Sequence, residues 1–335
     1  MLNKNTFTKI LRTIVLIVFI LINSLVAISQ AQQKQEDKRD FIRIDKVKPE
    51  EFAKNRANPK AFVKMVQTKS KANTQENNII GEVASLGLTL WNLRKSEADD
   101  TFRERNIIGN VIGTEKEEDL TPERVEGEPL KVEDGAYVRF SVESPVGGYL
   151  YVFDREQYVD GSYGVTYLVY PIKGVNNLED NNQIKINQPI YIPRQKEGYY
   201  INLTKGNERK VVADVYTFLV SPSPLGLNPI KCTKIGNNTK GEAIIKCGIR
   251  EVKKEEFDFE AKLKEWSSYT EVSDFNLKAQ NHKKYKTMDK AEIKSLNNKA
   301  NKLTVKSPPP QKVYTIARKP TEPYMLSIPI HYNDE

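Results

Sequence analysis

Hydrophobic and polar residues alternate most regularly over residues 136–143. Ala136, Val138, Phe140 and Val142 fall on one side, and Tyr137, Arg139, Ser141 and Glu143 fall on the other. A strand with one buried and one solvent-facing side gives this period of two, so we expect the first set inward and the second outward. The next run, 149–153, is apolar or aromatic on both sides, which predicts a central strand.

Other short runs are rich in β-branched and aromatic residues and are bounded by Gly, Pro, Asp or Asn. This pattern is typical of antiparallel strands, and we expect them near residues 86–94, 106–112, 165–170, 184–192, 199–203 and 211–220. Pro189 and Pro193 place their strand at an edge or an end, because proline donates no ladder hydrogen bond. Thr121–Arg124 is interpreted as a turn or linker. The fold class predicted is mainly β, with an antiparallel β-sandwich-like domain over residues 77–250.

Beyond residue 250 the apolar residues take roughly helical spacing. Glu251–Trp266 and Asp289–Leu303 are helix candidates, and together they predict a Lys-rich, helical insert over residues 251–305. Ser307–Pro310 is interpreted as a stiff polyproline spacer. Residues 306–335 then return to strand character, and we expect these C-terminal strands to rejoin the β-core.

The N-terminus has the layout of a secretory signal peptide over residues 1–31. Lys4, Lys9 and Arg12 precede an apolar run, and small residues follow it. The alternative is an uncleaved single anchor, which would be the chain's membrane contact, although the run is short for a bilayer span. Residues 32–76 are polar and predict a flexible linker with at most one short helix. We therefore expect an exported protein of the periplasm, cell surface or extracellular space.

Charge changes this picture little. The chain of 335 residues carries a formal charge of +8. Three positive residues lie in the signal segment, so the net charge of the remaining chain is about +5. This modest charge gives no argument for nucleic acid binding. An unknown envelope protein or glycan is the expected partner.

The two cysteines, Cys232 and Cys247, flank a turn-rich cluster, Asn237–Gly241. A turn over residues 238–241 would place them directly across a hairpin, close enough for a bond. An exported chain can oxidise them, so we expect a disulfide; two free buried thiols are the alternative.

Catalytic signals are sparse. The histidines are His282 and His331, and neither lies near a recognisable nucleophile motif. The scattered His and Cys residues do not form a zinc ligand set, so no metal, no cofactor and no enzyme activity are expected. Asp154–Gly161 could bind calcium through its carboxylates, but a turn explains this sequence better. A carbohydrate-active envelope hydrolase that uses paired carboxylates is the alternative function.

The candidate binding residues come from two segments. Tyr158 and Tyr163 lie in the loop that follows the central strand, and exposed tyrosines on a rigid sheet suit peptide or sugar binding. Lys283, Lys284 and Lys286 lie in the basic stretch and could grip anionic polymers or lipid headgroups. The alternatives are that the tyrosines fill the core and that the lysines form a solvated helical face.

A resemblance to a known family rests on the order of several short motifs. Arg139–Ser144, Gly148–Val152, Tyr170-Pro171, Ile192-Pro193 and Phe218–Leu225 occur in the order seen in the bacterial domain of unknown function 4384. Residues 130–225 resemble that domain, and Leu88–Arg94 and Pro310–Tyr314 are similar to flanks of its exported, stand-alone members. The resemblance implies a β-sandwich-like fold without an agreed activity. Members often accompany kinase-like or caspase-like domains, so a regulated enzyme would be a separate protein here. The function expected is a non-catalytic envelope binding or scaffolding module.

Overall fold

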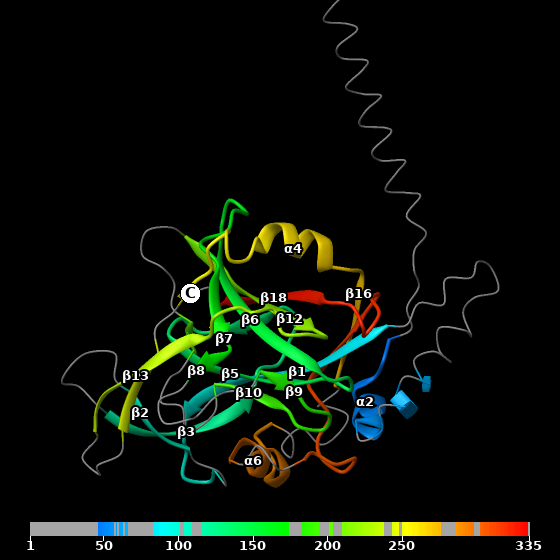
Figure 1. The fold of residues 1–335 in the computed structure, drawn as a ribbon. Helices are drawn as coiled ribbons and strands as arrows, with labels where there is room; N and C mark the ends of the chain where they lie inside the picture. The colour runs from blue at the N-terminus through cyan, green and yellow to red at the C-terminus, as the bar shows by residue number, and fades with distance from the viewer. Residues whose placement is uncertain are drawn as a thin grey trace, which may run out of the picture. The chain divides into compact units, whose positions relative to one another are not determined.

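Two mainly antiparallel sheets form the body of the molecule (Figure 1). The computed structural model describes residues 46–56, 58, 60–62, 64–65, 83–100, 104–108, 116–173, 182–193, 201–203, 210–237, 243–247, 250–275, 286–297 and 302–333. All of them belong to one compact unit, Ile44–Glu335. The expected signal peptide, residues 1–31, lies outside the described residues.

The first sheet is built around β1. Its order is β10 (Ile190–Ile192), β5 (Ala136–Glu143), β1 (Ala84–Lys95), β17 (Lys312–Ile316) and β16 (Thr270–Asp274). Three more strands extend it: β3 (Lys116–Arg124) pairs with β1, β2 (Glu104–Ile108) with β3, and β11 (Ile201–Leu203) with β5. The position of β10 at an edge confirms the prediction drawn from Pro189 and Pro193.

The second sheet is built around β6 and β12. Its order is β15 (Arg250–Glu251), β7 (Tyr167–Tyr170), β6 (Gly148–Tyr158), β12 (Val211–Ser221), β18 (Tyr324–Tyr332) and β4 (Leu130–Val132), with β9 (Gln183–Ile184) on β6. A smaller sheet holds β14 (Ala243–Cys247), β13 (Ile230–Asn237) and β8 (Ile172–Lys173). The mainly β, sandwich-like fold class is confirmed, and β6 is a central strand as its two apolar faces predict.

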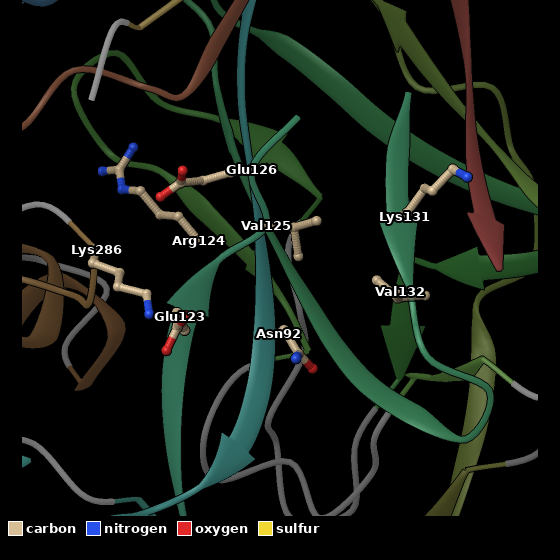
Figure 2. A pocket seen from close by; sticks show the side chains of 8 residues that line it. All are labelled: Asn92, Glu123, Arg124, Val125, Glu126, Lys131, Val132 and Lys286. Atoms are coloured by element: carbon tan, nitrogen blue, oxygen red, sulfur yellow. Dashed lines mark ion pairs between the residues drawn. The ribbon is translucent and has the colours of Figure 1, made fainter. Parts of the chain in front are cut away.

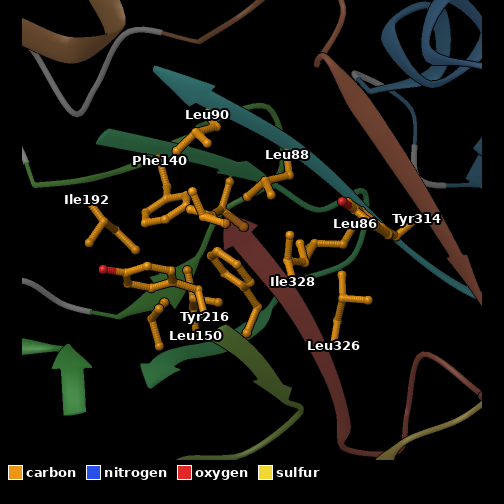
Figure 3. Close-up of a cluster of buried hydrophobic side chains, with 14 of the residues drawn as sticks. Leu86, Leu88, Leu90, Phe140, Leu150, Ile192, Tyr216, Tyr314, Leu326 and Ile328 are labelled. Carbon is orange, nitrogen blue, oxygen red and sulfur yellow. The ribbon is translucent and has the colours of Figure 1, made fainter. Parts of the chain in front are cut away.

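The main core lies between the two sheets (Figure 3). Leu86, Leu88 and Leu90 of β1 face it from the first sheet. Phe140 of β5 meets the second sheet across it, with its ring centroid 5.3 Å from that of Phe218 in an edge-on contact. Burial of these side chains is the main stabilising term of the fold.

Helices cover the outer faces of both sheets. On the second sheet, α4 (Phe259–Trp266) and the turn before it pack against β6, where the ring centroids of Phe153 and Phe257 lie 5.6 Å apart. On the first sheet, α2 (Pro49–Asn55) and α6 (Lys290–Asn297) cover β17 and β1. The sandwich therefore has a helical layer on each side.

These layers correct the expected outward face of residues 136–143. Arg139, Ser141 and Glu143 are buried, and Tyr137 is half-buried. Arg139 Nε donates to the Pro193 carbonyl at 2.8 Å, and Ser141 Oγ accepts from Trp91 Nε1 at 3.1 Å. The alternation separates polar from apolar residues correctly, but segments distant in the sequence cover the polar side. Arg139 and Ser141 find hydrogen-bond partners there, and Glu143 forms an ion pair with Arg56 at 3.4 Å.

Two more sequence interpretations are wrong. Thr121–Arg124 belongs to β3, where Pro122 pairs with Leu93 of β1. Pairing with β2 ends at Leu120, so Pro122 lies where the ladder has an edge and proline is tolerated. Pro308–Pro310 is buried and is not a spacer: Arg56 Nη2 donates to the Pro308 carbonyl at 2.8 Å.

The region interpreted as linker 32–76 is partly folded onto the first sheet. Val47, Phe52 and Phe62 are buried and form a cluster with Val83 and Val313. The apolar side chains that make this contact are too widely spaced to give a clear helical period. The contact was therefore not recognised in a segment of polar composition. The two predicted helices of the insert are also shorter, at Phe259–Trp266 and Lys290–Asn297.

Candidate functional site

The tip of the β6–β7 hairpin carries a concentration of exposed apolar side chains. Val159, Tyr163 and Val165 are 64%, 45% and 47% exposed. Among the described residues, the other large apolar side chains exposed to this degree are Tyr269 and Val305. Exposed apolar side chains gathered at one place are typical of an interaction surface.

Backbone bonds hold this tip in a defined turn. The Tyr158 amide donates to the Ser162 carbonyl, and the Gly161 amide donates to the Tyr158 carbonyl, each at 2.9 Å. Gly161 has a φ of 81°, which favours glycine. Asp160 Oδ1 accepts from the Ser162 amide at 2.9 Å, so this carboxylate closes the turn.

The Tyr163 ring stacks on the buried guanidinium of Arg155. The Arg155 guanidinium carbon lies 4.3 Å from the centroid of the Tyr163 ring and 4.6 Å from that of Phe259. Arg155 is buried and forms an ion pair with Glu260 at the start of α4. An aromatic ring stacked on a fixed guanidinium loses little freedom when it binds a partner.

Tyr158 occupies the opposite side of the hairpin. It is half-buried, packs against the core between the sheets, and its hydroxyl donates to Glu156 Oε2 at 2.8 Å. The pairing of Gln157 with Tyr163 places Tyr163 on the other side of the strand. The two candidate tyrosines therefore do not form one surface: Tyr158 closes the core and Tyr163 faces outward.

Lys286 lies beside the first sheet and not near Tyr163. Its side chain is 44% exposed, and its Nζ contacts Glu123 Oε1 at 2.7 Å. Tyr163 instead lies on the α4 side of the second sheet. The structure does not bring these candidates together, and Lys283 and Lys284 lie outside the described residues.

Lys286 lines a pocket of about 340 Å³ (Figure 2). The pocket adjoins β1, β3 and β4, and its lining consists of Asn92, Glu123, Arg124, Val125, Glu126, Lys131, Val132 and Lys286. Burial disfavours the charge of Glu123, but hydrogen bonds from Lys286 and Arg94 outweigh it and lower the pKa of this carboxyl. The pocket therefore keeps fixed charges of both signs.

A buried carboxyl pair lies on the inner face of the second sheet and was missed in the sequence. Asp154 and Asp214 occupy neighbouring central strands, and Tyr332 donates to Asp214 Oδ2 at 2.6 Å. Burial raises the pKa of Asp214 to about 6, and burial and the charge of Asp214 raise that of Asp154 well above its usual value. Extending the inward alternation of Leu150 and Val152 by one step would have found Asp154.

The cysteines stand opposite each other in the β13–β14 pairing, Cys232 beside Cys247. This register is compatible with the expected disulfide, and the bond itself stays a prediction. Within the described part of the chain, no group of three or more His, Cys, Asp or Glu side chains is arranged to hold a metal ion.

Comparison with known proteins adds no relative. No family model matches the chain, and neither curated proteins nor solved structures give a match. Within the described residues, no helix combines the length and the apolar character needed to cross a bilayer.

Proposed function

We propose that this protein is an exported, non-catalytic envelope protein whose β-domain binds or scaffolds another envelope component. The hairpin tip at Val159, Tyr163 and Val165 is the proposed contact surface. The observation that carries the proposal is the stacking of exposed Tyr163 on buried Arg155. Tyrosine is enriched among the few residues that contribute most of the binding energy of protein interfaces, and a rigid aromatic side chain loses little entropy on binding.

Two sequence features support an exported location and a non-catalytic role. The N-terminal segment has the layout of a signal peptide, and residues 130–225 resemble the domain of unknown function 4384, whose exported members have no agreed activity. The partner we propose is an envelope protein or a glycan. The modest charge gives no argument for a nucleic acid.

A photo-crosslinking amino acid placed at Tyr163 in living cells tests this function. Tyr269 is the matched control, since it is a tyrosine of similar exposure, at 49%, away from the hairpin. A discrete crosslinked partner from position 163, absent from position 269 and lost in a Val159→Ser, Val165→Ser background, supports the proposal. Equal products from both positions, or none from either, would contradict it.

A carbohydrate-active hydrolase is the second candidate, favoured by the raised pKa values of Asp154 and Asp214. A glycosidase needs one carboxyl that stays protonated near neutral pH. Against it, the pocket described above contains neither residue. Turnover of an envelope glycan by purified protein, abolished by Asp214→Asn in a variant of unchanged thermal midpoint, would establish this alternative.

A further inference from the structure

The side of β16 that faces away from β17 has no strand partner within the described part of the chain. The Phe275 amide donates to the Gln311 carbonyl at 2.7 Å, and the Ala317 amide donates to the Tyr269 carbonyl at 2.9 Å. Residues whose backbone groups bond to the neighbouring strand alternate along an antiparallel strand. In this register the N–H and C=O groups that point away from the sheet belong to Thr270, Val272 and Asp274.

This edge lacks the devices that protect other edges of the two sheets. A row of free backbone groups can pair with another chain, and prolines or bulges usually prevent such pairing. Pro122 lies in β3, Pro193 follows β10 and Pro329 lies in β18. β16 contains no proline, and its pairing with β17 has no bulge. Its free side is therefore a template for strand addition.

The acidic side chains of β16 are each paired with a lysine. Lys46 Nζ lies 3.1 Å from Glu271 Oε2, and Lys312 Nζ lies 2.6 Å from Asp274 Oδ1. Two unpaired carboxylates on each strand would make two copies of this edge repel each other. The lysines reduce that repulsion, so the edge can approach a second, identical edge.

We propose that the free side of β16 pairs with β16 of a second copy of this protein, as an antiparallel dimer with its two-fold axis at Val272. In this register Asp274 lies opposite Thr270 of the other copy, and Glu271 lies opposite Ser273. No like charges face each other, and each carboxylate meets a hydroxyl that can donate to it. Such a self-complementary surface is what a two-fold interface requires.

Tyr269 adds apolar surface beside this edge. Its side chain is 49% exposed, and its hydroxyl donates to Glu271. The two-fold axis brings one such tyrosine to each end of the paired strands. A strand of 5 residues contributes less buried surface than a permanent dimer has, so we expect a dimer that forms as the protein concentration rises.

Sedimentation of the purified protein from about 1 μM to 1 mM tests the proposal, and the mean mass should rise toward that of a dimer. Thr270→Pro removes an N–H that points away from β17, so each copy loses one donor to its partner and none within the domain. We expect its dimer dissociation constant to rise about tenfold or more. Thr270→Ser keeps both the amide and the hydroxyl and should dimerise as the wild type does.

A cysteine pair tests the register without relying on a proline. Opposite residues of this kind have Cα atoms about 4.5 Å apart, which suits a disulfide. A mixture of Glu271→Cys and Ser273→Cys chains should form an intermolecular disulfide under mild oxidation, and either variant alone should form much less. Equal crosslinking in the single-variant samples, or a monomer at every concentration, would overturn the proposal, even if the edge then bound a strand of another protein.

This dimer is independent of the hairpin function. Tyr163→Ala should leave the dissociation constant of the dimer unchanged. A photo-crosslinker at position 269 should capture a second copy of this chain, whose product has twice the mass of the protein. The partner captured from position 163 is a different molecule, so either proposal can fail without the other failing.

Discussion

The guanidinium of Arg155 lies between two aromatic rings, and the nearer one is Tyr163, with a guanidinium-to-centroid distance of 4.3 Å. One ring belongs to the exposed hairpin tip and the other, Phe259, to the helix that covers the second sheet. Arg155 therefore couples the proposed contact surface to the folded core. The hairpin tip is expected to behave as a part of the domain and not as an independent loop.

This coupling can be measured. Arg155→Met should lower the free energy of unfolding by about 1–2 kcal/mol, because two cation–π contacts are lost. Glu260 is not left as a buried charge, since its side chain is 72% exposed. Urea unfolding of Arg155→Met, Tyr163→Ala and the double variant should give a coupling energy of about 0.5–1 kcal/mol. Strictly additive losses would show that the stack contributes nothing, and Lys254→Met at an exposed ion pair is the control.

The buried carboxyls predict an unusual pH dependence. The pKa of Asp214 in the folded protein is about 6, above its ordinary value of 3.8, so between these values the folded state binds a proton that the unfolded state does not. The free energy of unfolding should therefore rise as pH falls from 7.5 to 5, on the order of 1–3 kcal/mol from this group. Glu292, whose pKa burial raises to about 7, acts in the same direction.

Urea unfolding at several pH values measures this effect. Asp214→Asn should reduce the rise in stability, while Asp99→Asn, at an exposed position, should keep the wild-type profile. A wild-type protein that loses stability steadily from pH 7.5 to 5 would contradict the assignment of raised pKa values to these carboxyls.

Oxidation of Cys232 and Cys247 should stabilise the folded protein. The bond would close a loop of about 16 residues, which corresponds to on the order of 3 kcal/mol in the chain-entropy description. Non-reducing peptide mapping should recover the linked peptides, and Cys232→Ser should lower the thermal midpoint in the absence of reductant. Two titratable thiols in freshly exported protein would refute the bond.

Export itself has a direct test. Ala27, Ser29 and Ala31 fit the small residues that signal peptidase needs, so the exported chain should begin at Gln30 or Gln32. N-terminal sequencing of protein collected from the envelope decides this. An intact Met1 would show that the apolar segment stays attached as an anchor.

Local patterns predicted most of the central strands, because short β-branched and aromatic runs bounded by turn residues are visible within each segment. The predicted strand 184–192 is two short strands, β9 and β10, separated by a turn. Local patterns failed wherever burial depends on segments distant in the sequence. Nothing within residues 136–143 shows that Arg139 or Glu143 will be covered, because the covering groups come from Pro193 and Arg56. The cation–π contact between Tyr163 and Arg155 could not be predicted either, because it depends on the direction that the chain takes after the turn at Gly161.

The outer face of the first sheet is covered closely at Gly87, and this close packing can be tested by substitution. A Cβ atom at Gly87 would lie 2.8 Å from Pro310 Cγ and 3.1 Å from the Phe52 ring. Both neighbours are buried and cannot move into solvent, so Gly87→Ala should lower the free energy of unfolding by about 1–3 kcal/mol through overpacking.

Gly236→Ala is the matched control, because a Cβ there meets no atom within 4 Å and should change stability by less than about 0.5 kcal/mol. If the N-terminal region and the proline segment did not cover this sheet, Gly87 would face open space and both substitutions would be equally mild. A large loss at Gly87 alone therefore tests whether residues 46–62 and Pro308–Pro310 belong to the folded domain.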